Sequence, residues 1–146
     1  MLYRCFLLDN FSSYGGAIVN QGRLNLVSCL FSNNIAAYSG GAIYSASGRV
    51  RIWNSTMISN ACGDGSGGAI DNAGDAELWL LNSRVQFNRA HIFQPDAVAC
   101  GGIDNSSDHP AILVHTLVRD NLGFSSYVIP SKHPDLFGEF VRLGRR

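Results

Sequence analysis

Short apolar stretches with a period of two occur at four places along the chain, each after a turn made of small residues. They read RLNLV, RVRIW, AELWL and AILVH. A period of two is typical of a β-strand that buries one of its faces. The pattern predicts that the following pairs face the core in successive strands: Leu24 and Leu26, Val50 and Ile52, Leu78 and Leu80, Ile112 and Val114.

A longer repeat surrounds these strands. Glycine pairs precede them, three followed by Ala-Ile and the last reading GGIDN, and they begin at Gly15, Gly40, Gly67 and Gly101. Each unit closes on an amide or acid, at Asn33, Asn60, Asn88 and Asp120. The segment YRCFLLDN aligns with VSCLFSNN, so residues 1–14 are expected to form an incomplete first coil. Such a repeat is the signature of a solenoid.

The repeat predicts a parallel β-helix rather than a helical solenoid. No unit carries an apolar stripe at the 3.6-residue spacing of an α-helix, and the glycines would break one. Three short strands in each unit would stack on those of the next, because stacked coils bury a continuous core and satisfy each other's backbone groups. Asparagine at the corners can pass amide hydrogen bonds from coil to coil. We predict an all-β, right-handed parallel β-helix of about four to five coils over residues 1–121.

Two segments depart from the repeat. The segment RAHIFQPDAVAC, residues 89–100, lengthens the third step and predicts a loop that bulges from a corner. Residues 122–146 lose the pattern, and Leu136, Phe137, Phe140 and Val141 follow Pro134 at helical spacing. They predict a short amphipathic helix that caps the open strand edges, with a plain tail as the alternative.

Composition narrows the function classes. Charged residues make up 15% of the chain, hydrophobic residues 46%, and the formal net charge is zero. This balance excludes a disordered chain and disfavours electrostatic binding of nucleic acid or anionic lipid. No apolar run approaches the roughly 20 residues of a transmembrane helix. The apolar start of the chain is interrupted by Asp9 and does not resemble a signal peptide.

The GGAI motif and a closing F-x-x-N, intact at residues 31–34, resemble the repeat of chlamydial polymorphic outer-membrane proteins. They are similar also to right-handed parallel β-helix, pectin-lyase-like repeat proteins of bacterial surfaces. The resemblance covers residues 3–121, with MISN and VQFN as degenerate copies of the closing motif. It implies an exported domain, at the cell surface or outside the cell, that serves adhesion or surface display.

Asp71 and Asp104 are the candidate catalytic residues. Each follows an isoleucine in a glycine-led strand, so stacking in register would place the two carboxylates one rung apart. They would then raise each other's pKa, share a Ca²⁺ ion, or act as an acid–base pair. Val19 and Tyr44 occupy the same place in earlier units, which favours a solvent-facing column without a catalytic role. No other cofactor is predicted.

Six residues are candidates for ligand binding. Tyr44, Trp53 and Trp79 are expected to project outward, where an aromatic column can stack on sugar rings or receive a protein; packing under a loop is the alternative. Arg49 and Arg51 alternate on one strand and can meet an acidic sugar, although an exposed strand face accounts for them equally well. His91 is singled out because it lies on the predicted bulging loop.

The four cysteines form no CxxC pair and no zinc-like cluster with histidines. Cys5 and Cys29 hold matching places in neighbouring units and predict either stacked free thiols or a disulfide. Cys62 and Cys100 both lie just before glycine-rich corners.

The sequence therefore favours a non-catalytic, adhesin-like surface module that binds a glycan or a protein through its strand faces and the 89–100 loop. End-to-end association of the coils is a further expectation. The alternative function is a carbohydrate-active enzyme, a polysaccharide lyase or glycoside hydrolase, because pectin-lyase-like folds include such enzymes.

Overall fold

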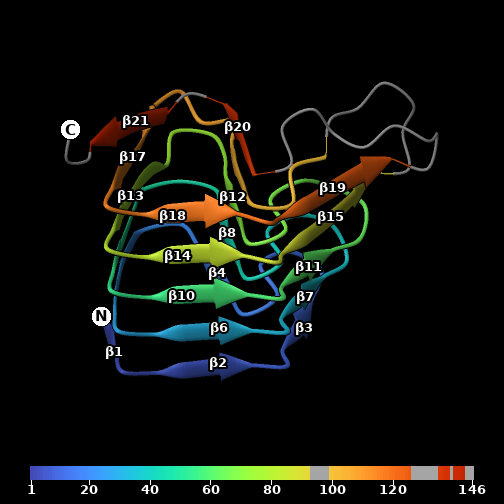
Figure 1. Ribbon diagram of the computed structural model, residues 1–146, viewed down its shortest axis with the longest axis horizontal. Coiled ribbons are helices and arrows are strands. Elements are labelled where there is room, and N and C mark those ends of the chain that lie inside the picture. The colour runs from blue at the N-terminus through green and yellow to red at the C-terminus, as the bar shows by residue number, and fades with distance from the viewer. Residues whose placement is uncertain (93–98, 126–134, 139, 144–146) are drawn as a thin grey trace.

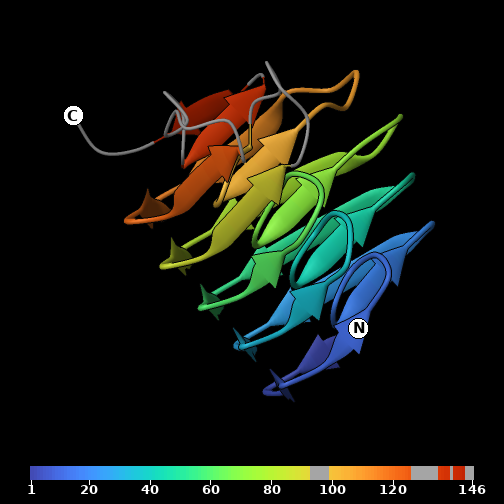
Figure 2. The ribbon, with the colours of Figure 1, turned by 90° about the vertical axis from the view of Figure 1, so that its right-hand side faces the viewer.

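The computed structural model describes residues 1–92, 99–125, 135–138 and 140–143, and these residues form a parallel β-solenoid. Four parallel sheets run along its length, with six strands in one and five in each of the others (Figure 1). These strand numbers are close to the predicted four to five coils. Figure 2 shows the coils stacked one upon another from the N-terminal end.

We name the sheets A to D in the order in which each coil visits them. Sheet A holds β1 (Leu2–Tyr3), β5 (Arg23–Val27), β9 (Arg49–Trp53), β13 (Glu77–Leu81), β17 (Ala111–Val114) and β21 (Phe140–Leu143). Sheet B holds β2 (Phe6–Leu8), β6 (Leu30–Ser32), β10 (Thr56–Ile58), β14 (Arg84–Gln86) and β18 (Leu117–Arg119). Sheet C holds β3 (Phe11–Ser12), β7 (Ile35–Ala36), β11 (Ala61–Cys62), β15 (Arg89–Ile92) and β19 (Leu122–Ser125). Sheet D holds β4 (Ile18–Asn20), β8 (Ile43–Ser45), β12 (Ile70–Asn72), β16 (Ile103–Asn105) and β20 (Leu136–Gly138).

A coil thus contains four strands and not the predicted three. The additional strands belong to sheet C, where the first three are only two residues long. Two residues are too few to produce an alternating pattern in the sequence.

The predicted C-terminal helix is wrong, and the described part of the chain contains no helix. Leu136 and Phe137 lie in β20, which pairs with β16, while Phe140 and Val141 lie in β21, which pairs with β17. The preceding strand β19 pairs with β15, so strand pairing continues beyond residue 121. The unpaired backbone groups of the last edge outweigh the helical spacing of the apolar side chains, because a strand satisfies those groups.

The inward-facing residues of sheets A, B and D form the main core, while Ala36, Cys62, Ala90 and Ala99 form a second, smaller cluster at sheet C. The prediction is confirmed for sheet A in the middle coils, where Val50, Ile52, Leu78 and Leu80 are fully buried. It is wrong for β17, where Ala111 and Leu113 face inward instead of Ile112 and Val114. The run AILV is apolar throughout, so only its pairing with β13 fixes which face is buried.

Two corners of the coil depend on residues in the left-handed backbone region. Ten non-glycine residues of the described chain lie at these corners with φ between 48° and 57°. Five turn the chain from sheet A to sheet B, namely Arg4, Ser28, Asn54, Asn82 and His115. Five turn it from sheet B to sheet C, namely Asp9, Asn33, Ser59, Phe87 and Asp120. Asn, Asp and Ser recur here because their short polar side chains tolerate this conformation.

In each coil an asparagine follows the corner between sheets B and C, and these asparagines form a hydrogen-bonded ladder along the solenoid. Side-chain amides donate to the Oδ1 atom of the next rung at 2.8–3.0 Å, through Asn10, Asn34, Asn60, Asn88, Asn121 and finally Asp135. Coil-to-coil amide bonding, predicted from the sequence, is therefore confirmed. Two of the predicted residues, Asn33 and Asp120, are instead the corner residues that precede the ladder.

The same ladder explains the closing F-x-x-N motif. Its first position is the inward residue of sheet B, occupied by Leu7, Phe31, Met57, Val85 and Val118 in successive coils. Its last position is the ladder asparagine. The first position therefore accepts any apolar side chain, while the last requires an amide, which is why the motif looks degenerate in most units.

The glycine corner between sheets C and D brings neighbouring backbones into close contact. A Cβ atom at Gly41 would collide with the carbonyl oxygens of Gly68 and Ala61. The hydrogen bond from the Gly68 amide to the Cys100 carbonyl places Cys100, not Gly101, beside Gly67. The fourth unit is thus shifted by one residue from the predicted alignment, and Gly102 takes the place that alanine holds in the three GGAI units.

The four cysteines, all among the described residues, form no disulfide bond. Cys5 and Cys29 stack in one column, as predicted, and each thiol contacts the carbonyl oxygen two residues before it at 3.4 Å. Ser55 and Ser83 continue this column with the same bond at 2.8 and 2.9 Å. A thiol or hydroxyl group suits this position because it can donate a hydrogen bond to the carbonyl oxygen two residues earlier, at the end of the sheet A strand.

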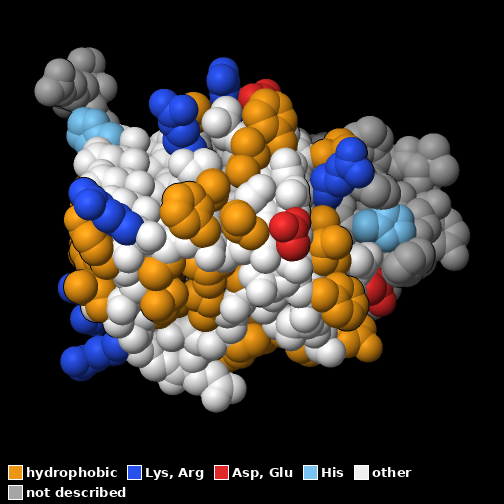
Figure 3. All heavy atoms as spheres, turned by 90° about the horizontal axis from the view of Figure 1, so that it is seen from below, with side chains coloured by type: hydrophobic (Ala, Val, Ile, Leu, Met, Phe, Trp, Pro, Cys, Tyr) orange, Lys and Arg blue, Asp and Glu red, His pale blue; other side chains and the backbone are white. Residues whose placement is uncertain are grey.

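Hydrophobic side chains gather at the face of the first coil (Figure 3). The exposed large apolar residues of this coil are Met1, Tyr3, Phe6, Leu8, Phe11, Tyr14 and Val19. No coil of the described chain covers the outer edge of strands β1 to β4.

Replacing a central ladder residue tests the contribution of the ladder to stability. Asn60 accepts bonds from the backbone and side-chain amides of Asn34, and donates to Asn88. Asn60→Ala leaves those buried groups unpaired and should lower the free energy of unfolding by about 3 kcal/mol. Urea denaturation measures this as a lower midpoint at an unchanged slope. Asn10→Ala, at the exposed end of the ladder, is the matched control and should cost less than about 1 kcal/mol.

Candidate functional site

The outer face of sheet A brings together four of the six predicted binding residues. Arg51 pairs with Trp79 across neighbouring strands, and Trp53 pairs with Leu81. Arg49 lies two residues before Arg51 on β9 and points to the same side. These side chains are all partly exposed, and the prediction that both tryptophans project outward is confirmed.

Polar contacts hold this face in place. The Arg51 guanidinium lies 5.5 Å from the centre of the Trp79 ring, a cation–π contact. Arg49 forms a two-pronged ion pair with Glu77, with Nε–Oε2 and Nη2–Oε1 distances of 2.6 and 3.0 Å. That hydrogen-bonded pair raises the pKa of Arg49 and lowers the pKa of Glu77. The result is an ordered flat surface of indole rings and guanidinium groups.

Tyr44 and His91 lie on other sheets and do not join this surface. Tyr44 is on β8 in sheet D, and its ring lies 5.1 Å from the ring of Tyr14, which in turn contacts Tyr38. His91 is on β15 in sheet C, where Nδ1 lies 3.3 Å from the Gly63 carbonyl oxygen. Residues 89–92 of the predicted bulging loop are therefore a strand, and residues 93–98 lie outside the described residues.

Asp71 and Asp104 stack one rung apart in sheet D, as the sequence predicts. Val19 and Tyr44 occupy the same column in earlier coils. The prediction of a solvent-facing column is wrong for the two acids, since Val19 is 50% exposed but each aspartate only 7%. Ser39 and Ser66, in the glycine-rich corners before sheet D, hydrogen-bond to Asp71 and Asp104 respectively.

Burial dominates the electrostatics of this pair. Burial and then the charge of Asp104 raise the pKa of Asp71 to about 7, and burial raises the pKa of Asp104. Burial also raises the pKa of the nearby Cys62 thiol to about 12, with the charge of Asp71 adding to the effect. Asp71 can therefore hold a proton near neutral pH, but the burial of both carboxylates gives a bulky substrate little access. In the described chain, no group of three or more His, Cys, Asp or Glu side chains is placed to hold a metal ion.

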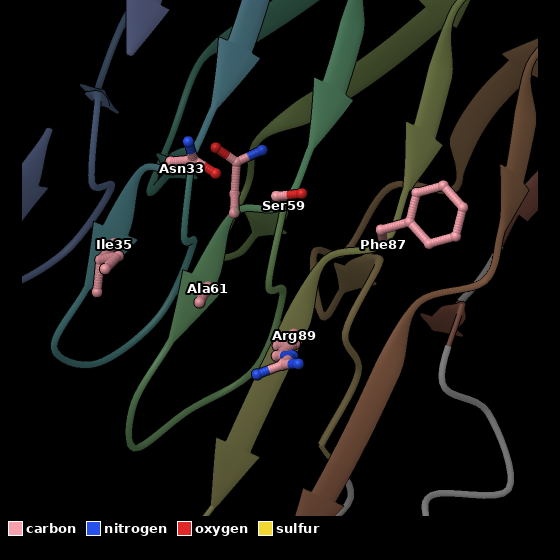
Figure 4. A pocket seen from close by; sticks show the side chains of 7 residues that line it. Asn33, Ile35, Ser59, Ala61, Phe87 and Arg89 are labelled. Atoms are coloured by element: carbon pink, nitrogen blue, oxygen red, sulfur yellow. The ribbon is translucent and has the colours of Figure 1, made fainter. Parts of the chain in front are cut away.

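A groove at the corner between sheets B and C was not predicted from the sequence. It contains a hollow of about 400 Å³ that is lined by Asn33, Ile35, Ser59, Asn60, Ala61, Phe87 and Arg89 (Figure 4). The sequence signal was present in VQFN, where an aromatic residue stands at a left-handed corner. As a degenerate copy of the closing motif, VQFN gives no indication of a groove.

Comparison with known families supports the repeat. Residues 28–46 match the family model of the Chlamydia polymorphic membrane protein repeat, a segment that contains β6, β7 and β8. Comparisons with curated proteins and with solved structures found no match. The described chain is thus a parallel β-solenoid built from repeats, and its segment 28–46 is similar to the polymorphic membrane protein repeat. No described helix is long and apolar enough to span a bilayer.

The buried carboxylate pair predicts an unusual dependence of stability on pH. The pKa of Asp71 is about 7 in the folded protein against an ordinary 3.8, so the folded state holds the proton more tightly. Its stabilising contribution is complete below pH 3.8 and is lost as pH rises through about 7. Asp71→Asn, which mimics the protonated acid, should raise the melting temperature at pH 8 and leave it nearly unchanged at pH 4.

The exposed Asp108 provides the control, because Asp108→Asn should change the melting temperature little at either pH. Equal effects of Asp71→Asn at pH 4 and pH 8 would contradict the proposed proton uptake by this pair.

Proposed function

We propose that this chain is a rigid, non-catalytic module of a surface-exposed protein, and that it binds a protein partner through the outer face of sheet A. The match to a repeat of membrane proteins supports a place at the cell surface. The observation that carries the binding role is that two outward tryptophans, Trp53 and Trp79, share one face of sheet A with arginines, and that Arg51 pairs with Trp79. Trp and Arg are the residues most enriched among those that dominate the affinity of protein interfaces.

The chemistry of this face indicates its partner. Outward apolar side chains lie in the same two columns of sheet A as the tryptophans. Val27, Leu81 and Val114 stand in the column of Trp53, and Ile112 stands beside Trp79. Arg23, Arg49 and Arg51 lie beside them, and of these only Arg49 is paired with Glu77. A partner with an apolar centre and an acidic rim would complement this arrangement.

A carbohydrate-active enzyme centred on Asp71 and Asp104 is less well supported. A glycosidase must bring its acid and its base or nucleophile into contact with the sugar. Both carboxylates are only 7% exposed, and corner residues hydrogen-bond to them. We therefore favour the binding role over a catalytic role for this chain.

The test uses the fluorescently labelled chain and cultured epithelial cells, with binding measured by flow cytometry before and after trypsin removes cell-surface proteins. Trp79→Ala should weaken binding about tenfold or more, because it removes a large aromatic contact at the centre of the face. Leu117→Ala is the matched control, since Leu117 is exposed on the outer face of sheet B. Its binding should equal that of the wild type.

Loss of binding after trypsin treatment is expected for a protein partner. Binding that survives trypsin would favour a glycan on this face, while full binding by Trp79→Ala, or none by the wild type, would contradict the proposal.

Sedimentation of the isolated chain should be run in parallel, because we also propose end-to-end association through the exposed apolar side chains of the first coil.

A further inference from the structure

Phe87 is an unexpected residue for its position. It occupies the left-handed corner between sheets B and C at φ 56°, where the other coils have Asp9, Asn33, Ser59 and Asp120. A bulky aromatic residue is disfavoured in this backbone region, whereas Asn and Asp tolerate it. The ring gains little burial in return, because Phe87 is 54% exposed. A strained and exposed aromatic residue indicates a function other than folding.

The groove beside Phe87 follows from the sizes of the side chains on successive coils. Its two walls are a row of corner residues, Asn33, Ser59 and Phe87, and a row from sheet C, Ile35, Ala61 and Arg89 (Figure 4). Ser59 and Ala61 are the smallest members of the two rows and belong to the same coil. The hollow of about 400 Å³ therefore lies where one coil has short side chains between two coils with longer ones.

A second hollow lies on the other side of the same residues. It measures about 200 Å³ and is lined by Phe87, Asn88, Arg89, Asp120 and Leu122. Phe87 and Arg89 thus form a ridge shared by two hollows along the solenoid axis. A ligand that fills both must be a chain of at least two units, with its central contact at this ridge.

The chemistry of the groove favours an acidic sugar. Phe87 offers an exposed ring face, which suits the apolar face of a sugar ring. Asn33 and Ser59 supply an amide and a hydroxyl for hydrogen bonds to sugar hydroxyls. Arg89 is exposed and forms no ion pair with any described residue, so it is available for a carboxylate.

The backbone in this region disfavours an extended peptide. Peptides that add a strand to a sheet need an edge with unpaired backbone groups. Around the groove, β10 and β14 each have a neighbouring strand on both sides, and so do β11 and β15. An added peptide strand is therefore disfavoured, and the side chains that line the groove suit a flat, hydroxyl-rich ring.

We propose that the groove between sheets B and C binds an oligosaccharide that carries carboxylate groups, with Phe87 stacking on one sugar ring and Arg89 pairing with a sugar carboxylate. This site lies on different sheets from the protein-binding face of sheet A. It does not depend on the function proposed for that face.

Isothermal titration calorimetry of the full chain with a tetrasaccharide that contains glucuronic acid tests the site. Phe87→Asn should weaken binding about tenfold, because it removes the stacking ring. Asparagine suits the left-handed corner better than phenylalanine, so the melting temperature should stay the same or rise. Misfolding therefore cannot account for a loss of affinity in this variant. Arg89→Gln should likewise weaken binding about tenfold, through loss of a charge-assisted hydrogen bond.

The same tetrasaccharide with its carboxyl groups reduced to alcohols is the ligand control. Wild type should bind it about tenfold more weakly than the acidic form, and Arg89→Gln should no longer distinguish the two. Trp79→Ala should bind the acidic sugar as the wild type does, which separates this site from the face of sheet A. The proposal is overturned if the wild type binds neither sugar, or binds both equally. It is also overturned if Phe87→Asn keeps full affinity, or if an acidic peptide is the better ligand.

Discussion

The structure depends on hydrogen bonds between equivalent residues of successive coils. The asparagine ladder places amide side chains, Asn34, Asn60 and Asn88, where no water can reach them, and each satisfies the backbone of the coil before it. A buried amide without such a partner would be costly. Each coil is therefore stabilised when its neighbour presents a side-chain oxygen acceptor at the same place. This requirement explains why the sequence repeats.

That constraint leaves the outward positions free to vary. In one column of sheet D the residues are Val19, Tyr44, Asp71 and Asp104, and their sequence neighbours face the core. The column through Asn25, Arg51 and Trp79 in sheet A varies as widely. Surfaces with a distinct chemistry can then arise without change to the core. Binding sites in such a fold are assembled from several coils, and no single unit contains one.

The sequence predicted those parts of the fold that repeat. Alternation in RLNLV, RVRIW and AELWL defined sheet A, and the recurring asparagines indicated the ladder. Features specific to one coil were not predictable in this way. The run AILV contains no polar residue to mark its outer face, and the shift at Cys100 became visible only through strand pairing. The spacing of Leu136 and Phe140 suits a helix, but the open edge of the last coil provides partners for strands.

Only those features of the candidate sites that follow from the repeat were predictable from the sequence. Alternation shows that Trp53 and Trp79 point outward, and the repeat shows that Asp71 and Asp104 stack. Neither pattern reveals that the two acids are buried. The groove beside Phe87 depends on differences in size between coils, which a search for similarity ignores.

Amide hydrogen exchange followed by NMR tests the central claim most directly. The backbone amides of Asn34, Asn60 and Asn88 donate to the side-chain oxygen of the next coil at 2.9–3.0 Å. If the ladder holds the coils together, these amides should be among the slowest to exchange, at rates that approach global unfolding. Exchange as fast as that of exposed corner residues would show that the coils do not depend on the ladder.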